Sequence, residues 1–386
     1  MPDVPTVRAF LSPSHEELAA RCGVFTEAEV APLPSPEGDA ACRAQARTLA
    51  RLLGHAGWLH PIGQPDLRAC CLIRETLAAA SPLADAVFAL QALGGLPLVL
   101  AGTEAQKRRW LEPALAGTAV AAFAMTESDA GSDVAAMNTH AARDGNGFVL
   151  NGAKTLISNA GIADFYLVFA STDPALASKA IGCFLVPADA RGCRFVKAQV
   201  LSAPHPLGEI AFEDCRVPAD AVLASPGAGL KLGFATLDRL RATVGAAACG
   251  MAERALAEAL AHVRARRQFG QALADFQLTQ LKLSRMATDL AAARLLVYRA
   301  AAEQDGGQER VTVESAMAKA FATEAAQRIV DDAVQLFGGR GVLADHPVDR
   351  LYRSVRALRI YEGTTEIQHL IIARHLLRGA DAPAPA

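Results

Sequence analysis

Apolar residues recur at three- and four-residue spacing between residues 16 and 116, as Leu49, Leu52 and Leu53 illustrate. This spacing places apolar side chains along one face of a helix. Several prolines interrupt the pattern and separate one helix from the next. Residues 1–118 are therefore predicted to form an N-terminal helical domain.

The period changes to that of strands after residue 117. Strand-like runs cover residues 120–125, 139–158, 165–170, 181–186 and 210–212. The sequence Asp144-Gly145-Asn146-Gly147 interrupts one of them, and such turns need the positive φ angles that glycine and asparagine tolerate. A hairpin is predicted there, inside a middle β domain, a barrel or sandwich, that covers residues 119–225.

Helical spacing returns in long blocks after residue 229. The predicted helices cover residues 230–264, 274–303, 311–337 and 364–377. Gly306-Gly307 and Gly338-Gly339 separate them. Helices of this length, laid side by side, predict a C-terminal four-helix bundle over residues 226–386. The fold class is therefore α+β, in the order helical domain, β domain, helical bundle.

Composition excludes several classes of function. The 386 residues carry 38 Lys and Arg against 40 Asp and Glu, so a net charge of -2 gives no overall attraction to nucleic acid or to anionic lipid. No uncharged apolar stretch of about 18 residues is expected to span a membrane. A nucleic-acid or membrane partner is therefore not expected.

The cysteines and the N-terminus bear on the compartment. The eight cysteines are scattered without C-x-x-C spacing, which favours reduced thiols over a zinc site. The start of the chain, Met1 to Val4, lacks the basic and apolar segments of a signal peptide. We expect a cytoplasmic protein, and the excess of Ala, and of Arg over Lys, favours a GC-rich bacterial genome.

Three segments concentrate glycines and polar side chains. Residues 123–133 read FAMTESDAGSD, residues 266–270 read RRQFG with Gln277 downstream, and residues 360–368 read IYEGTTEIQ. In this order and at this separation they resemble the signatures of the acyl-CoA dehydrogenase family. The resemblance covers nearly the whole chain. It implies an FAD-dependent enzyme that oxidises an acyl-CoA thioester to the 2,3-enoyl-CoA.

The resemblance also implies one set of FAD contacts. These are Phe123, Met125, Thr126, Ser132, Ile157, Ser158, Thr364 and Glu366. Backbone N–H groups and hydroxyls in a turn of small residues suit the negative charge that develops on a reduced flavin. Ser158 keeps the hydroxyl that faces the flavin's reactive nitrogen in the family, whereas Leu156 replaces the usual Trp. The alternative for residues 126–133 is an ordinary surface loop.

A second set of contacts is implied for the dinucleotide half of FAD, reached across a subunit interface. It consists of Arg266, Phe269, Gln277, Gln335, Gly338 and Gly339. A guanidinium pairs with a pyrophosphate, and glycine lets the backbone approach it. The alternative for residues 335–339 is a plain helix C-cap, and both can hold together.

Glu362 is the catalytic base that the resemblance implies. It also implies substrate contacts at Ser132, Asp238, Arg241 and Gly363. Leu240 occupies the position from which the isovaleryl-type branch supplies its base, and leucine cannot accept a proton. A structural salt bridge is the alternative for Asp238 and Arg241.

The histidines give no further site. His205 lies in a rigid segment between two prolines, where it could contact substrate, but a structural role is favoured because no acid partner is evident. His369 and His375 are six residues apart, which separates them on a helix, so no metal site is predicted.

The resemblance further implies an electron-transferring flavoprotein as acceptor and a homotetramer built as a dimer of dimers. Two alternatives stay open at this point. An acyl-CoA oxidase or a flavin monooxygenase shares the fold, and the missing Trp bears on oxygen access. A non-catalytic flavin-binding relative is the other alternative, although Glu362 speaks against it.

Overall fold

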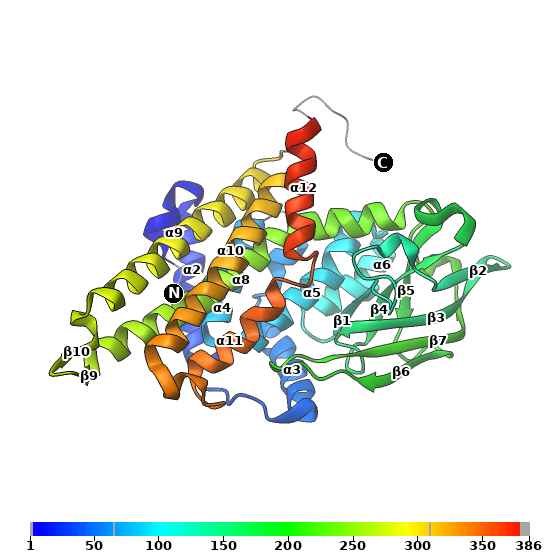
Figure 1. The fold of residues 1–386 in the computed structure, drawn as a ribbon. Coiled ribbons are helices and arrows are strands. Elements are labelled where there is room, and N and C mark those ends of the chain that lie inside the picture. Colours follow the sequence, from blue (N-terminus) through cyan, green and yellow to red (C-terminus); the bar gives the residue numbers. More distant parts are fainter. Residues whose placement is uncertain (1–2, 65, 309, 379–386) are drawn as a thin grey trace. The chain divides into compact units, whose positions relative to one another are not determined.

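The computed structural model describes residues 3–64, 66–308 and 310–378 (Figure 1). Contacts divide the chain into two compact units. The helical unit is drawn from Met1–Leu33, Asp66–Asp85 and Asp238–Ala386, and the sheet unit from Pro34–Pro65 and Ala86–Leu237. Each unit thus combines segments that are far apart in the sequence.

Eight α-helices, most of them long, are described in the helical unit. They are α1 (Val4–Val7), α2 (Pro13–Phe25), α4 (Leu67–Ala80), α8 (Gly229–Ala265, in this unit from Asp238), α9 (Gln277–Asp305), α10 (Thr312–Phe337), α11 (Pro347–Leu358) and α12 (Thr365–Arg378). Helices α9 and α10 lie side by side, and α10 also packs against α11 and α12 (Figure 1). The short strands β9 (Arg267–Gln268) and β10 (Gln271–Ala272) form a hairpin between α8 and α9.

Glycines in α8 let its neighbours approach closely. A Cβ on Gly250 would lie 2.1 Å from the carbonyl oxygen of Glu75 in α4, and one on Gly245 would lie 2.7 Å from the Val297 side chain in α9. Gly250 therefore has no room for even the methyl group of alanine, and an alanine at position 245 would require Val297 to shift. The predicted glycine breaks are confirmed, since Gly306 caps α9 and Gly338, at φ 61°, follows the last residue of α10.

A buried ionic cluster links three helices of this unit. Glu75 in α4 accepts hydrogen bonds from Arg294 Nε at 2.7 Å and from Tyr298 Oη at 2.8 Å, both in α9. Arg294 also donates to Glu253 in α8 at 3.0 Å. The buried carboxylate of Glu75 and the guanidinium of Arg294 therefore satisfy each other's hydrogen bonds without water. These bonds also fix the positions of α4, α8 and α9 relative to one another.

The sheet unit combines helices with one eight-stranded sheet. Its helices are α3 (Gly38–His55), α5 (Pro82–Ala101, in this unit from Ala86), α6 (Glu104–Gln106) and α7 (Glu112–Leu115). Its strands are β1 (Ala121–Ala124), β2 (His140–Asp144), β3 (Gly147–Ser158), β4 (Phe165–Ser171), β5 (Ile181–Pro187), β6 (Cys193–Ala198), β7 (Leu207–Val217) and β8 (Val222–Ala224). The strand order is β6-β7-β3-β2-β4-β5-β8, and β1 pairs with β4 in parallel.

Strand β4 is buried on both faces. Phe165, Leu167 and Phe169 belong to one apolar cluster, together with Leu98 of α5. The alternate residues of the strand, such as Tyr166, belong to a second cluster. An unbroken apolar run is the sequence that a strand buried on both faces requires.

Helix α5 corrects one expectation. It is long and apolar enough to cross a membrane by length and composition, although no such stretch was expected. Of its most apolar 18-residue window, 67% is buried inside the structure. Helix α5 therefore has the burial of a core helix.

The predicted hairpin is confirmed, because β2 and β3 pair antiparallel with Asp144 opposite Gly147. The predicted helices after residue 229 are also present, with ends that shift by a few residues. Among the strands and helices named above, the strands β6, β8, β9 and β10 and the helix α11 were not predicted.

Candidate active site

Glu362 and Gly363 form a turn between α11 and α12. Both have positive φ angles, 55° and 87°. A Cβ on Gly363 would lie 2.7 Å from Gln368 Nε2, so this position requires glycine on both counts. A glutamate with positive φ is strained and persists only where its surroundings hold it.

Side chains from three helices hold this turn through its carbonyl groups. Lys319 Nζ in α10 donates to Gly363 O at 2.6 Å, and Gln368 Nε2 in α12 donates to the same oxygen at 2.9 Å. Gln368 Nε2 also lies 3.3 Å from Glu362 O, and Arg241 Nε in α8 lies 3.5 Å from it. Lys319 is 1% exposed. Buried side-chain donors of α8, α10 and α12 therefore hold the backbone of this turn.

The Glu362 carboxylate itself is poorly satisfied. Its Oε2 atom is buried and has no hydrogen-bond partner among the residues that the structure describes. Burial raises the pKa of Glu362, while Arg74, Lys319 and Arg241 oppose that rise. Burial lowers the pKa of Lys319 to about 8, against the opposing effect of Glu362. A carboxylate with raised pKa and a free oxygen is suited to accept a proton.

Arg74 and Asp85 form a buried ion pair close to Glu362, and the sequence analysis missed both. Arg74 Nε and Nη2 contact the two Asp85 oxygens at 2.7 and 3.0 Å, and Nη1 donates to Thr243 Oγ1 at 2.8 Å. Arg74 also shares a hydrogen bond with Tyr361, which precedes the base. The pair therefore brings a fixed, compensated charge beside the turn.

Asp238 and Arg241 do form the ion pair that was the structural alternative for them. Asp238 also accepts a hydrogen bond from Thr312 Oγ1 at 3.0 Å. Arg241 is 5% exposed, so its guanidinium is used inside the helical unit. Leu240 is buried as well, and it offers no second proton acceptor.

In the sheet unit, residues 123–133 begin within the end of strand β1 and continue into the turn that follows it. Glu127 and Ala130 exchange backbone hydrogen bonds of 3.2 and 3.3 Å, which closes a tight turn. Phe123 packs against Phe169 with ring centroids 4.8 Å apart. Met125 is buried, Thr126 is half-buried and Ser132 is exposed.

A buried ion pair supports this turn, and the sequence analysis missed it. Lys154 Nζ contacts Glu127 Oε1 at 2.7 Å and Met125 O at 3.1 Å. The Glu127 carboxylate also accepts the backbone N–H groups of Asn138 and Thr139. Burial opposes ionisation of Glu127, but Lys154 and these donors hold its pKa below the usual range. The glycine- and serine-rich turn is thus anchored to strand β3.

The end of β3 presents Ile157 and Ser158. Thr155 N donates to Thr126 O at 3.0 Å, which brings this strand end beside the turn at residues 126–133. Leu156 has a φ of 54°, and its side chain is 54% exposed. Ser158 Oγ lies 2.7 Å from His205 Nε2. His205 therefore has a specific partner that its sequence context did not indicate.

Of the second predicted set, Arg266 and residues 335–339 lie where α8 and α10 end. The Phe337 ring stacks on His262 at 4.2 Å and contacts His346 at 4.4 Å. The pKa of His262 is lowered by burial and by the nearby cations Arg340 and Arg266. Arg266 and residues 335–339 are thus brought to one end of the helical unit, together with a second arginine.

This end of the unit combines positive charge with accessible glycine backbone, the two features that an anionic group such as a pyrophosphate requires. Arg266 and Arg340 supply positive charge. A Cβ added to Gly338 or Gly339 would meet nothing within 4 Å, so the backbone there borders open space. Phe269, at the tip of the β9–β10 hairpin, is 93% exposed, and Gln277 begins α9.

The remaining predicted contacts lie at the start of α12. Thr364 Oγ1 accepts the backbone N–H of Ile367 at 3.4 Å. Glu366 is exposed, and its hydrogen bond with Thr364 lowers its pKa. Within residues 3–64, 66–308 and 310–378, no group of three or more His, Cys, Asp or Glu side chains could hold a metal ion.

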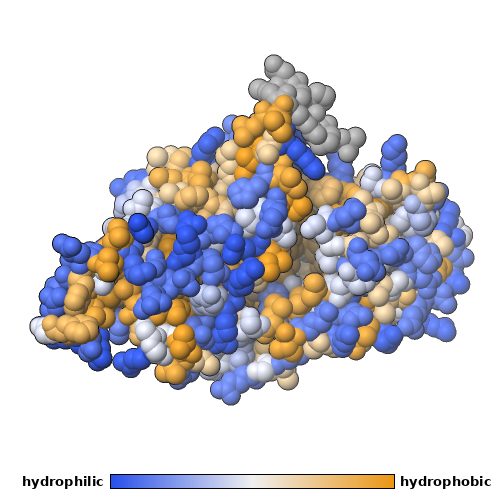
Figure 2. Space-filling model, in the orientation of Figure 1, coloured by the Kyte–Doolittle hydropathy of each residue, from blue (hydrophilic) through white to orange (hydrophobic). Residues whose placement is uncertain are grey.

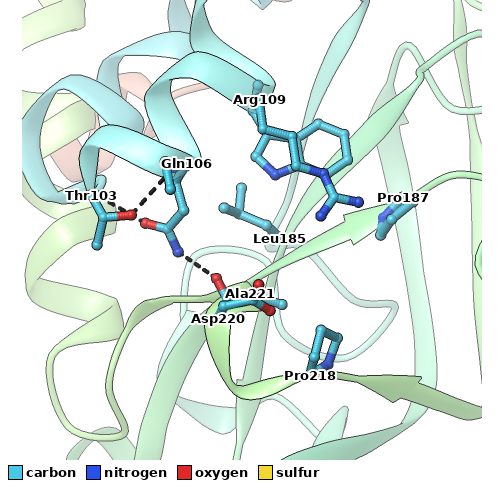
Figure 3. A pocket seen from close by; sticks show the side chains of 10 residues that line it. Thr103, Gln106, Arg109, Leu185, Pro187, Pro218, Asp220 and Ala221 are labelled. Atoms are coloured by element: carbon cyan, nitrogen blue, oxygen red, sulfur yellow. Dashed lines mark hydrogen bonds between the residues drawn. The ribbon is translucent and has the colours of Figure 1, made fainter.

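A surface pocket of the sheet unit lies among α6, the segment after it and the end of β7 (Figure 3). Gln106 Nε2 donates to Asp220 O at 2.8 Å at one side of it. Arg109 lies over the Trp110 ring, 4.7 Å from its centre. None of the predicted site residues lines this pocket.

The residues that the sequence analysis missed share one property. Arg74, Asp85, Lys154, Lys319 and Gln368 are all buried polar side chains. Lys319, for example, stands in an alanine-rich helical stretch from Ala316 to Ala326. A charged residue within such a stretch was the available signal, because a buried charge requires a partner.

Comparisons with known proteins bear on the family and on the fold. The models of the acyl-CoA dehydrogenase N-terminal, middle and C-terminal domains match residues 12–118, 122–215 and 227–377. A probable acyl-CoA dehydrogenase of Mycobacterium tuberculosis is 38% identical over 378 residues, which are 95% of this chain and 96% of that protein.

Two solved structures share the fold. Butyryl-CoA dehydrogenase of Megasphaera elsdenii has a TM-score of 0.88 at 32% identity, over 95% of this chain and 99% of that one. A chain in a structure of the electron transferring flavoprotein of Acidaminococcus fermentans has a TM-score of 0.88 at 33% identity, over 96% and 99%. The predicted fold class is thereby confirmed.

The Lys154–Glu127 pair gives a prediction on stability. Lys154→Met should destabilise the protein by about 3–5 kcal/mol, because it leaves a buried carboxylate without its cation. Arg194→Met is the matched control, since its pair with Glu213 is exposed and should cost about 1 kcal/mol or less. Denaturant unfolding of both variants measures the difference, and equal losses would contradict the prediction.

Proposed function

The chain belongs to the acyl-CoA dehydrogenase family and is an FAD-dependent acyl-CoA dehydrogenase, and from this premise we propose that Glu362 is its catalytic base. The observation that carries the proposal is the buried Glu362 Oε2 atom, which lacks a partner among the described residues. A group with an unused acceptor can receive the α-proton of the thioester without first breaking another bond.

The surroundings of Glu362 adjust its basicity in two directions. Burial raises its pKa and so makes the carboxylate a stronger base. Arg74, Lys319 and Arg241 act against burial and favour the ionised form. The net effect is a raised pKa, so Glu362 holds a proton more readily than an exposed glutamate does.

The α-proton of a thioester is only weakly acidic, so its carbonyl group must be polarised. We propose that the backbone N–H of Glu362 donates to this carbonyl oxygen. Bound FAD supplies the hydride acceptor for the hydrogen that leaves the β-carbon. The product is the 2,3-enoyl-CoA.

Two sets of residues are assigned to FAD in this proposal. Those for the flavin half are Phe123, Met125, Thr126, Ser132, Ile157, Ser158, Thr364 and Glu366, and those for the dinucleotide half are Arg266, Phe269, Gln277, Gln335, Gly338 and Gly339. The first set is supported by the anchored turn at residues 126–133. The second is supported by the arginines and open glycines at the ends of α8 and α10.

Substrate contacts are proposed at Ser132, which is exposed, and at Gly363, which lies beside the base. Asp238 and Arg241 were assigned to the substrate as well. However, Asp238 and Arg241 form an ion pair with each other, and Arg241 also contacts Glu362 O. We propose that these two residues act by holding the turn at Glu362 and Gly363 in place.

We propose that the enzyme is a homotetramer built as a dimer of dimers, with Arg266 donated to the FAD of a neighbouring subunit. Large apolar side chains are exposed on the helical unit: Phe269, Leu278, Val342, Leu343, Leu376 and Leu377. Figure 2 shows apolar surface along α12. Contiguous apolar surface of the kind that α12 presents is typical of an interface.

An electron-transferring flavoprotein is the proposed electron acceptor. The family assignment and the similarity to a chain in the Acidaminococcus fermentans structure support this choice. We also propose a bacterial, cytoplasmic enzyme, since the chain is similar to a bacterial relative and all eight cysteines are free thiols.

Replacement of the proposed base gives the most direct test. Glu362→Gln should fold and retain FAD, yet reduce its flavin with acyl-CoA more than about a hundredfold more slowly, because an amide cannot accept the proton. Stopped-flow absorbance under anaerobic conditions measures this rate. Glu303→Gln, in a surface pair with Arg299, is the control. A Glu362→Gln rate near that of the control would remove Glu362 from the mechanism.

Lys319 should shift the pH dependence of the same step. The rate should rise with pH as Glu362 ionises, and Lys319→Met should move the midpoint to higher pH, because a cation that lowers the pKa of Glu362 is lost. The shift belongs to the range below about pH 8, in which Lys319 itself is charged. Lys319→Arg should restore the profile in part. Identical midpoints for Lys319→Met and the exposed control Lys231→Met would refute this role.

Arg266 links the cofactor to assembly in this proposal. Arg266→Ala should lose FAD more readily and form fewer tetramers, because a ligand shared across an interface couples both equilibria. Flavin absorbance after dialysis and sedimentation velocity measure the two effects. Full flavin content with an unchanged oligomer would contradict a shared site.

A further inference from the structure

The segment from Gln199 to Pro206 lies along the end of strand β3. The side-chain amide of Gln199 bonds to Thr155 Oγ1 and to Leu156 N, both at 2.8 Å. At the other end of the segment, Pro206 O accepts the Asn159 N–H at 2.7 Å. Hydrogen bonds at both ends therefore fasten this segment before any contact of His205 is considered.

His205 adds a contact of a different kind, to a side chain of the proposed flavin site. Its Nε2 lies 2.7 Å from Ser158 Oγ. Pro204 and Pro206 flank it, and a residue before proline is restricted to extended backbone conformations. Burial lowers the pKa of His205 to about 4, so the ring is neutral near pH 7. The backbone thus presents a neutral imidazole to the Ser158 hydroxyl.

A neutral imidazole carries one N–H donor and one acceptor nitrogen. If Nε2 is the acceptor, it takes the only proton of Ser158, and the hydroxyl can then only accept from another group. If Nε2 carries the proton, it donates to Ser158 Oγ and leaves the serine proton free to be donated elsewhere. The tautomer of His205 therefore decides whether Ser158 is a donor or an acceptor toward its other neighbour.

Resting on the proposed flavin site, we propose that His205 is a positioning residue that donates from Nε2 to Ser158 Oγ and so directs the serine hydroxyl proton to the reactive nitrogen of FAD. The oxidised flavin has an acceptor at that nitrogen, which matches a donor hydroxyl. The contact is not needed to hold the segment in place, because hydrogen bonds at Gln199 and Pro206 already do so.

The test is a double-mutant cycle between His205 and Ser158, read on the cofactor. His205→Phe keeps the ring volume and removes the hydrogen bond, and His205→Gln retains a donor near the position of Nε2. Ser158→Ala and the double variant complete the cycle, and His140→Phe, at an exposed histidine of β2, is the control. Fluorescence titration of apoprotein with FAD gives the dissociation constant, and spectroelectrochemistry gives the midpoint potential. Thermal unfolding reports stability separately.

His205→Phe and Ser158→Ala should each weaken FAD binding by about two- to tenfold, as expected for one hydrogen bond. Both should shift the midpoint potential in the same direction. The double variant should match Ser158→Ala alone, since His205 acts only through the serine, and His205→Gln should recover most of the effect. If His205→Phe does not fold, His205→Asn, which is too short to reach Ser158, replaces it.

Two outcomes would overturn the proposal. In the first, His205→Phe lowers thermal stability but leaves the FAD dissociation constant and the potential unchanged, which makes His205 a structural residue. In the second, Ser158→Ala has no effect on either, so that the serine does not contact the flavin. A failure of the proposed FAD site is recognised separately, because the unmodified protein would then bind no FAD.

Discussion

The hydrogen bond from Lys319 to the Gly363 carbonyl is the interaction on which the turn at Glu362 and Gly363 most depends. Positive φ at Glu362 stores strain of about 1–3 kcal/mol, and the donors below the turn offset it. Lys319 does more than hold the backbone, because its charge also opposes the rise in the pKa of Glu362. One buried amine thus couples the position of the proposed base to its protonation state.

A buried lysine also supports the turn at residues 126–133. Lys154 and Glu127 anchor the turn that follows β1, as Lys319 and Gln368 anchor the turn before α12. Buried charges are costly and stabilise a structure only when their geometry and hydrogen bonds are complete. Their value here lies in specificity, since small flexible turns of glycine, serine and threonine would otherwise adopt many conformations. Rigid support lets exposed loops carry chemistry.

Leu156 and the contact between Ser158 and His205 lie close together in the sheet unit. Leu156 stands where the family resemblance places a Trp, and Ser158 is joined to His205 two residues further along β3. If the imidazole directs the hydroxyl, this polar contact sets the environment of the flavin nitrogen. The electronic properties of the cofactor are then a property of the pair and of the segment that presents it.

The sequence by itself determined the fold class, the hairpin at Asp144 and the segments that contain the site, because these depend on local periodicity, turn chemistry and contiguous motifs. It missed α11, whose buried residues Val348, Leu351 and Val355 follow helical spacing among charged ones. Only the tertiary structure decided the partners of Lys319 and Lys154. The hydrogen bond from Lys319 to Gly363 spans 44 residues, and a buried charge announces that it needs a partner without saying where along the chain that partner lies.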